Sequence, residues 1–188
     1  QIAALRSLGC TLQETQMPGE LPIEIQADGL AGGEIEVTTD TSSQFVSGLL
    51  MAAPLCDKGL TLRLLGTPVS RPYIDMTIEV MREFGVDVNK LDDSTYVVPP
   101  SRYRATVLGV EPDATAASYF FGAAVITQGK VRVDGLDKRS IQGDIQFVSV
   151  LDELGAKVTW GDGYIEVEGD HISGGSFDLQ DFSDTAQT

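Results

Sequence analysis

One succession of strand and helix patterns occurs twice in this sequence, about seventy residues apart. The first copy places strand patterns at 34–37, 60–64, 84–88 and 95–98, and helical patterns within 39–54 and 72–84. The second copy places helical patterns within 111–124 and 143–154, and strand patterns at 131–133, 154–158 and 164–167. We therefore predict an α/β (α+β) fold built from a βαβαββ unit that occurs twice.

Serine-containing turns lead into both helices of the first copy. Ser42 and Ser43 end the turn before the first helix, and Ser70 lies just ahead of Pro72, a residue that suits a first helical turn. These serines either cap their helices or bind an anion together with the free N–H groups of the helix starts. If both turns lie at one edge of the sheet, three hydroxyls converge on one phosphate without many lysines. The residues alone leave both interpretations open.

The charge balance excludes several classes of partner. Lys and Arg number 13 against 28 Asp and Glu, which gives a formal net charge of −15. Such a chain offers no basic run for nucleic acid and is repelled by anionic membrane surfaces. No apolar stretch reaches the length of a membrane span, and no signal segment opens the sequence. We expect neither a nucleic-acid partner nor a membrane partner.

Cysteine and histidine are too scarce for the common metal sites. Cys10 and Cys56 stand alone without a CxxC spacing, which predicts reduced thiols and a cytoplasmic protein. His171 is the single histidine and lies in a Gly/Ser-rich turn, where a zinc site or a serine–histidine triad is hard to build. No Walker sequence and no GxGxxG fingerprint is present. We expect no metal and no cofactor.

Five blocks along the chain resemble the 5-enolpyruvylshikimate-3-phosphate synthase family, in the family's order and with plausible spacing. They are SSQFVSGLLMAAPL (42–55), SRPYIDMTIEVMREFGV (70–86), ASYFFGAAVITQGKVRV (117–133), SIQGDIQFVSVLDELGA (140–156) and DTAQT (184–188). The resemblance covers nearly the whole chain but only the middle of such an enzyme. The family's N-terminal lysine segment and its arginine- and lysine-bearing C-terminal segments have no counterpart here.

The resemblance implies a two-lobed enolpyruvyl transferase architecture, an inside-out α/β barrel of which this chain is a part. Residues 1–110 would form part of the first lobe, with one complete unit and a preceding helix. Residues 111–188 would form part of the second lobe, with one complete unit and the start of the next. The active site of the family lies in the cleft between its lobes.

The resemblance also implies a reaction and its residues. The family moves the enolpyruvyl group of phosphoenolpyruvate to the 5-hydroxyl of shikimate 3-phosphate and releases phosphate. Ser42, Ser43 and Ser70 would bind the phosphate of shikimate 3-phosphate. Gln44 would lie against the shikimate ring near phosphoenolpyruvate, and Tyr73 would form a side wall. We expect a monomer that binds these two small molecules.

Asp184 matches the family's proton-accepting aspartate beside the shikimate hydroxyls. From the sequence alone, the favoured role of Asp184 is instead the N-cap of a helix that starts at Thr185. Asp178 and Asp181 are nearby acidic competitors for the catalytic role. Asp113 and Asp144 stand at helix entries of the second copy and are interpreted as caps, hinge contacts or core contacts.

Two other functions remain open at this point. One is the sister enolpyruvyl transferase that uses UDP-N-acetylglucosamine, although neither Cys10 nor Cys56 lies on a Gly-rich loop like that family's reactive cysteine. The other is a non-catalytic module that keeps the repeat fold. Because the cations that clamp phosphoenolpyruvate have no counterpart here, we expect the 188-residue chain by itself to be inactive.

Overall fold

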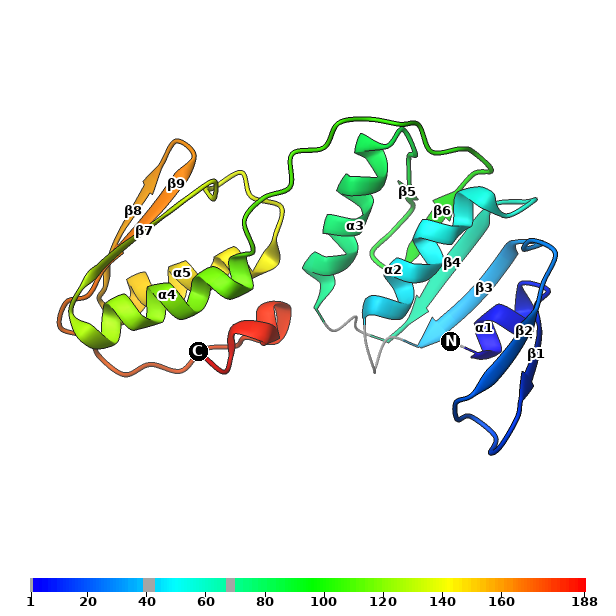
Figure 1. The fold of residues 1–188 in the computed structure, drawn as a ribbon, viewed down its shortest axis with the longest axis horizontal. Helices are drawn as coiled ribbons and strands as arrows, with labels where there is room; N and C mark the ends of the chain where they lie inside the picture. The colour runs from blue at the N-terminus through cyan, green and yellow to red at the C-terminus, as the bar shows by residue number, and fades with distance from the viewer. Residues whose placement is uncertain (1, 39–42, 67–69) are drawn as a thin grey trace. The chain divides into compact units, whose positions relative to one another are not determined.

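The computed structural model describes residues 2–38, 43–66 and 70–188, which fall into two compact units, 1–107 and 108–188 (Figure 1). The first unit contains α1 (Ile2–Ser7), β1 (Thr11–Glu14), β2 (Ile23–Gln26), β3 (Gly33–Thr38), α2 (Ser43–Ala52), η1 (Ala53–Leu55), β4 (Leu60–Leu65), α3 (Arg71–Glu83), β5 (Asn89–Lys90) and β6 (Thr95–Val98). The second contains α4 (Ala114–Thr127), β7 (Lys130–Asp134), η2 (Gly143–Gln146), α5 (Phe147–Leu154), β8 (Lys157–Gly161), β9 (Tyr164–Glu168) and η3 (Gln180–Thr185). The predicted α/β class is confirmed.

The main sheet of the first unit has the strand order β3-β4-β6-β5. β3 and β4 run parallel, and the other pairs are antiparallel. Ile35, Leu62 and Tyr96 point to one face and are buried in the core with residues of α2 and α3. Alternate residues point to the other face, where Arg63 pairs with Glu34 at 3.0 Å. The alternation follows from the two-residue period of a strand.

The sheet of the second unit is antiparallel throughout, with the order β7-β9-β8. α4 and α5 supply its core partners (Figure 1). Phe121 and Val148 of these helices are buried with Ile165 and Val167 of β9. Each unit therefore buries its own apolar cluster between a sheet and two helices.

The predicted helix ends agree with the structure. Pro72 lies in the first turn of α3, and Asp113 caps α4 by accepting from Ala116 N at 2.9 Å. Gly85 follows α3 with φ of 79°, and Gly155 follows α5 with φ of 111°. Glycine suits these positions because an L side chain rarely adopts such angles.

The second copy departs from the expected complete unit, because within the described residues of the second unit, 108–188, no strand precedes α4. The preceding segment, 101–113, contains neither helix nor strand, and Val107 and Val110 are 98% and 88% exposed. β7 is consequently an edge strand. Arg104 N donates to Phe84 O at 2.8 Å, which holds the start of the segment at the end of α3 instead of in a sheet. Over the residues that this structure describes, the second copy is therefore seen without a strand ahead of α4.

Three further features differ from the sequence analysis or go beyond it. The β1–β2 hairpin has no counterpart in the repeat pattern. The helix expected over 143–154 begins as the 3-10 segment η2 before α5 continues it. Across the described ranges, none of the helices is both long and apolar enough to span a membrane.

Candidate functional site

The parallel pairing of β3 and β4 sets the position of two helix starts. The last residues of the strands, Thr38 and Leu65, are register partners, so both strands end at the same edge of the sheet. α2 begins at Ser43 and α3 at Arg71, directly after Ser70. The two helices pack side by side over the sheet (Figure 1). Because β3 and β4 both end at this edge, the N-termini of α2 and α3 both face it. This is the arrangement that a shared anion site requires.

Ser70 has an unusual backbone for a serine. Its φ and ψ are 55° and 50°, in the left-handed region, and its side chain forms no cap hydrogen bond with α3. The residue is 9% exposed. The left-handed region is unfavourable for L-residues, and such strain concentrates at ligand-binding positions. The structure therefore contradicts the reading of Ser70 as a conventional helix cap.

Ser43, Gln44 and Tyr73 lie within the first turns of the two helices. Ser43 is the first residue of α2 and is 5% exposed, whereas Gln44 is exposed. Tyr73 is half-buried, and its N–H donates to Ser70 O at 3.2 Å. These residues gather at the same end of the α2–α3 pair. Ser42, predicted as a phosphate ligand, lies outside the described residues.

A hydroxyl pair fixes α2 and α3 against each other near this end. Thr77 Oγ1 lies 2.8 Å from Ser47 Oγ and also donates to Tyr73 O at 2.7 Å. The first hydrogen bond joins the two helices, and the second returns to the backbone of the helix turn that carries Tyr73. The candidate serines and Tyr73 are thus on rigidly connected elements, as a preorganised site requires.

Asp184, the predicted proton acceptor, belongs to the second unit and lies inside η3. Its side chain is exposed, while its neighbours Phe182 and Thr185 are buried. The N-cap position of η3 is Leu179, and Asp184 lies near the end of this segment. Asp184 therefore does not cap the start of η3.

Contacts with α4 hold the segment around Asp184 in place. Gln187 Nε2 donates to Tyr119 Oη at 2.8 Å, and the hydroxyls of Thr188 and Ser118 lie 2.9 Å apart. Of the acidic competitors, Asp178 accepts from Gln180 N at 3.0 Å, which gives it a turn-forming role.

The two helix-entry aspartates of the second unit have structural partners. Asp113 is the α4 cap, as expected. Asp144 is 4% exposed and accepts a hydrogen bond from Thr115, which links η2 to α4. Glu111 reinforces this link by accepting from Ser140 Oγ at 2.5 Å and from Gln142 Nε2 at 2.9 Å.

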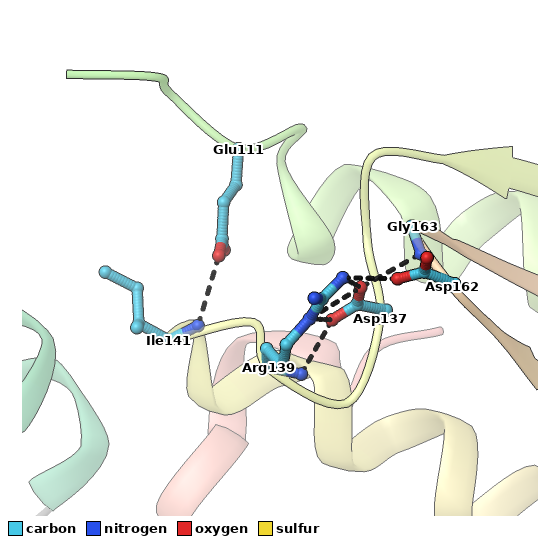
Figure 2. Close-up of polar contacts among 6 residues, drawn as sticks. All are labelled: Glu111, Asp137, Arg139, Ile141, Asp162 and Gly163. Atoms are coloured by element: carbon cyan, nitrogen blue, oxygen red, sulfur yellow. Dashed lines mark hydrogen bonds and ion pairs between the residues drawn. The ribbon is translucent and has the colours of Figure 1, made fainter. Parts of the chain in front are cut away.

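A second polar cluster, missed by the sequence analysis, organises the loop after β7 (Figure 2). Asp137 accepts from the backbone N and the guanidinium of Arg139 and from Gly163 N, the last at 3.0 Å. Arg139 also pairs with Asp162 at 2.8 Å. The hydrogen bonds from the Arg139 side chain hold the pKa of Asp137 well below its usual range. This carboxylate is fully engaged in joining the loop to the β8–β9 turn, so its role is structural.

An apolar hollow of about 470 Å³ lies in the first unit beside α2 and α3. Its lining consists of Met51, Met76, Thr77, Val80, Met81, Phe84 and Tyr103. This lining lacks charged side chains and does not suit phosphate or carboxylate groups. The helix starts at the sheet edge are the better candidate for an anionic ligand.

Comparison with known proteins assigns the chain. The family model described as EPSP synthase (3-phosphoshikimate 1-carboxyvinyltransferase) matches residues 1–188. The chain belongs to the EPSP synthase family. Proteins named 3-phosphoshikimate 1-carboxyvinyltransferase from Actinobacillus pleuropneumoniae serotype 5b and Sulfurovum sp. are 41% and 40% identical to it. Both matches include 100% of this chain and 44% of the relative, so the chain spans less than half of their length.

Solved structures agree with this family in fold. An EPSP synthase from Acinetobacter baumannii superposes with a TM-score of 0.76 at 20% identity, over 98% of this chain and 43% of that chain. The enolpyruvyl transferase NikO from Streptomyces tendae gives a TM-score of 0.66 at 18% identity, over 89% and 41% of the two chains. The expected enolpyruvyl transferase fold is thereby confirmed for the part present here.

Proposed function

We propose that a full-length family enzyme containing this chain transfers the enolpyruvyl group of phosphoenolpyruvate to the 5-hydroxyl of shikimate 3-phosphate and releases phosphate. Support comes from the family membership and from the names of the relatives. The observation that carries the proposal is the pair of helix starts, with Ser43 and Ser70, at one edge of the β3–β4 pair.

In this proposal the first unit binds the phosphate of shikimate 3-phosphate. Ser42, Ser43 and Ser70 donate hydroxyl hydrogen bonds to its oxygens, and the N-termini of α2 and α3 add their positive dipole ends. Such a site is compatible with a net charge of −15, since it relies on hydroxyls and backbone N–H groups. Gln44 lies against the shikimate ring near phosphoenolpyruvate, and Tyr73 forms the side wall.

The chemistry proceeds by addition and elimination. Asp184 takes the proton from the 5-hydroxyl of shikimate 3-phosphate. At the same time the hydroxyl oxygen forms a bond to C2 of phosphoenolpyruvate, and an acid protonates the methylene carbon. The resulting tetrahedral intermediate then loses a proton from the new methyl group and expels phosphate, which restores the double bond. The exposure of Asp184, in a segment fixed by its contacts with α4, is compatible with proton transfer to a ligand.

We further propose that residues 1–110 belong to one lobe of the enzyme and residues 111–188 to the other. The enzyme acts as a monomer in the cytoplasm. The two buried free cysteines, Cys10 and Cys56, support a reducing compartment.

The test is a coupled phosphate-release assay on a full-length family enzyme that includes this chain. Phosphate release that requires both shikimate 3-phosphate and phosphoenolpyruvate is the expected result. UDP-N-acetylglucosamine in place of shikimate 3-phosphate is the matched control for the sister transferase, and it should give no release. Absence of release with both proper substrates would favour a non-catalytic module and refute the proposal.

A further inference from the structure

The first residue of α3 is tied by an ion pair to a turn between two strands of its sheet. Arg71 Nη2 lies 2.8 Å from Asp93 Oδ1, in the turn between β5 and β6. Lys90 Nζ also lies 3.4 Å from the same carboxylate oxygen. The hydrogen bonds from Arg71 and Lys90 lower the pKa of Asp93, so it is a stable anion at neutral pH. The start of α3 and the β5–β6 turn are therefore linked through side chains.

The helix dipole does not favour a cation at this position. The first turn of α3 contains no acidic residue, and the positive end of a helix dipole repels a cation placed there. Asp93 offsets that repulsion from outside the helix. An arginine in this place adds positive potential next to Ser70, which is favourable for an anionic ligand and unfavourable for the isolated helix.

A buried tyrosine, Tyr96, lies close enough to Arg71 to interact with its charge. Tyr96 of β6 is fully buried, and within the described ranges its hydroxyl has no hydrogen-bond partner. Burial raises the pKa of the Tyr96 hydroxyl, and the positive charge of Arg71 opposes that rise. Tyr96 shares the core cluster of Ile74, one turn into α3. The buried core thus reaches the first turn of α3.

Ser70, adjacent to Arg71, has the left-handed backbone described above. A strained residue keeps its conformation when its surroundings fix it. On the C-terminal side of Ser70, the first turn of α3 provides this support, because Tyr73 N donates to Ser70 O and Arg71 pairs with Asp93.

We propose that Arg71 is a positioning residue for shikimate 3-phosphate: its ion pair with Asp93 fixes the first turn of α3 and thereby holds Ser70 in place for the phosphate. This inference rests on the proposed function, since it assumes that Ser70 binds that phosphate. It assigns a role in substrate affinity to two residues that lie outside the set of predicted contacts.

The test uses Arg71→Ala, Asp93→Asn and their double variant in a full-length family enzyme that includes this chain. Each single variant should raise KM for shikimate 3-phosphate roughly two- to fivefold, the effect of losing one exposed ion pair. Both should leave kcat and KM for phosphoenolpyruvate within about twofold. The double variant should be no worse than either single variant, because both remove the same link. Arg71→Lys should restore much of the affinity.

Glu79→Gln is the matched control, because Glu79 pairs with Arg82 on the exposed surface of the same helix. It should leave KM for shikimate 3-phosphate unchanged. If Arg71→Ala does not fold, Asp93→Asn and Arg71→Lys still decide the question.

The inference is overturned if Asp93→Asn leaves KM unchanged while Arg71→Ala raises it, because Arg71 then acts without the ion pair. Additive effects in the double variant also overturn it. A wild-type enzyme that does not use shikimate 3-phosphate would instead refute the proposed function, so the two failures are distinguishable.

Discussion

Replacement of Ser70 separates its backbone role from its binding role, because two variants remove the same hydroxyl. Ser70→Ala and Ser70→Gly differ at a residue with φ of 55°. A left-handed L-residue costs about 1–2 kcal/mol, whereas glycine adds roughly 0.5–1 kcal/mol of conformational entropy to the unfolded chain. The net expectation is that Ser70→Gly has a free energy of unfolding about 0.5–1 kcal/mol above that of Ser70→Ala.

Ser70→Ala and Ser70→Gly should weaken the binding of shikimate 3-phosphate to the same extent. If the Ser70 hydroxyl donates to a phosphate oxygen, either variant loses a charge-assisted hydrogen bond worth about 1.5–3 kcal/mol. The dissociation constant of shikimate 3-phosphate should therefore rise roughly 10- to 150-fold in both variants. Stability and affinity are thus predicted to respond differently to the same two changes.

Thermal unfolding and calorimetric titration on the full-length variants measure the two effects. Because a full-length enzyme is more than twice as long as this chain, Ser70→Gly should melt only about 0.5–1 °C above Ser70→Ala. Equal melting temperatures would refute the assignment of strain to Ser70. A dissociation constant that stays at the wild-type value would refute its role as a phosphate ligand.

Three further predictions address other residues. Asp113→Ala should lower the free energy of unfolding by about 0.5–2 kcal/mol through loss of the α4 cap, and an unchanged KM for both substrates in steady-state assays confirms a purely structural role. The pKa of Asp137 is depressed on folding, so its stabilisation is present above its unfolded pKa, near 4, and is lost as the pH falls below that value. The melting-temperature difference between wild type and Asp137→Asn should accordingly be full at pH 7 and shrink below about pH 4; a difference independent of pH contradicts this. Ser42→Ala combined with Ser43→Ala should raise the dissociation constant of shikimate 3-phosphate more than it reduces stability, and a fall in melting temperature at constant affinity would make these serines caps alone.

The sequence anticipated those parts of the fold that depend on local pattern. The period of apolar residues located α2, α3, α4 and β6, and the glycines after α3 and α5 marked their ends. From the sequence, a shared anion site was expected only if both serine-containing turns lie at one edge of the sheet. The parallel register of β3 and β4 meets that condition.

Features that depend on tertiary contacts were not predictable in this way. A strand ahead of α4 would have to pair with the edge strand β7. A pattern of apolar residues does not predict whether two strands pair. The left-handed angle of Ser70 has no residue-level signal, because serine normally avoids that region. The Asp137–Arg139 cluster joins a loop to a hairpin turn more than twenty residues later. The DGLDKR and GDG turns contain its members, but no spacing rule connects them.

The most direct test of the proposed mechanism is the turnover number of Asp184→Asn in a full-length family enzyme that includes this chain. Asparagine keeps the size and hydrogen-bonding capacity of the side chain but removes the base. The turnover number should fall by about two to four orders of magnitude, with much smaller changes in substrate affinity. Asp178→Asn and Asp181→Asn are the matched controls and should remain close to wild type. A near-wild-type turnover number for Asp184→Asn would contradict the mechanism and remove this residue from it.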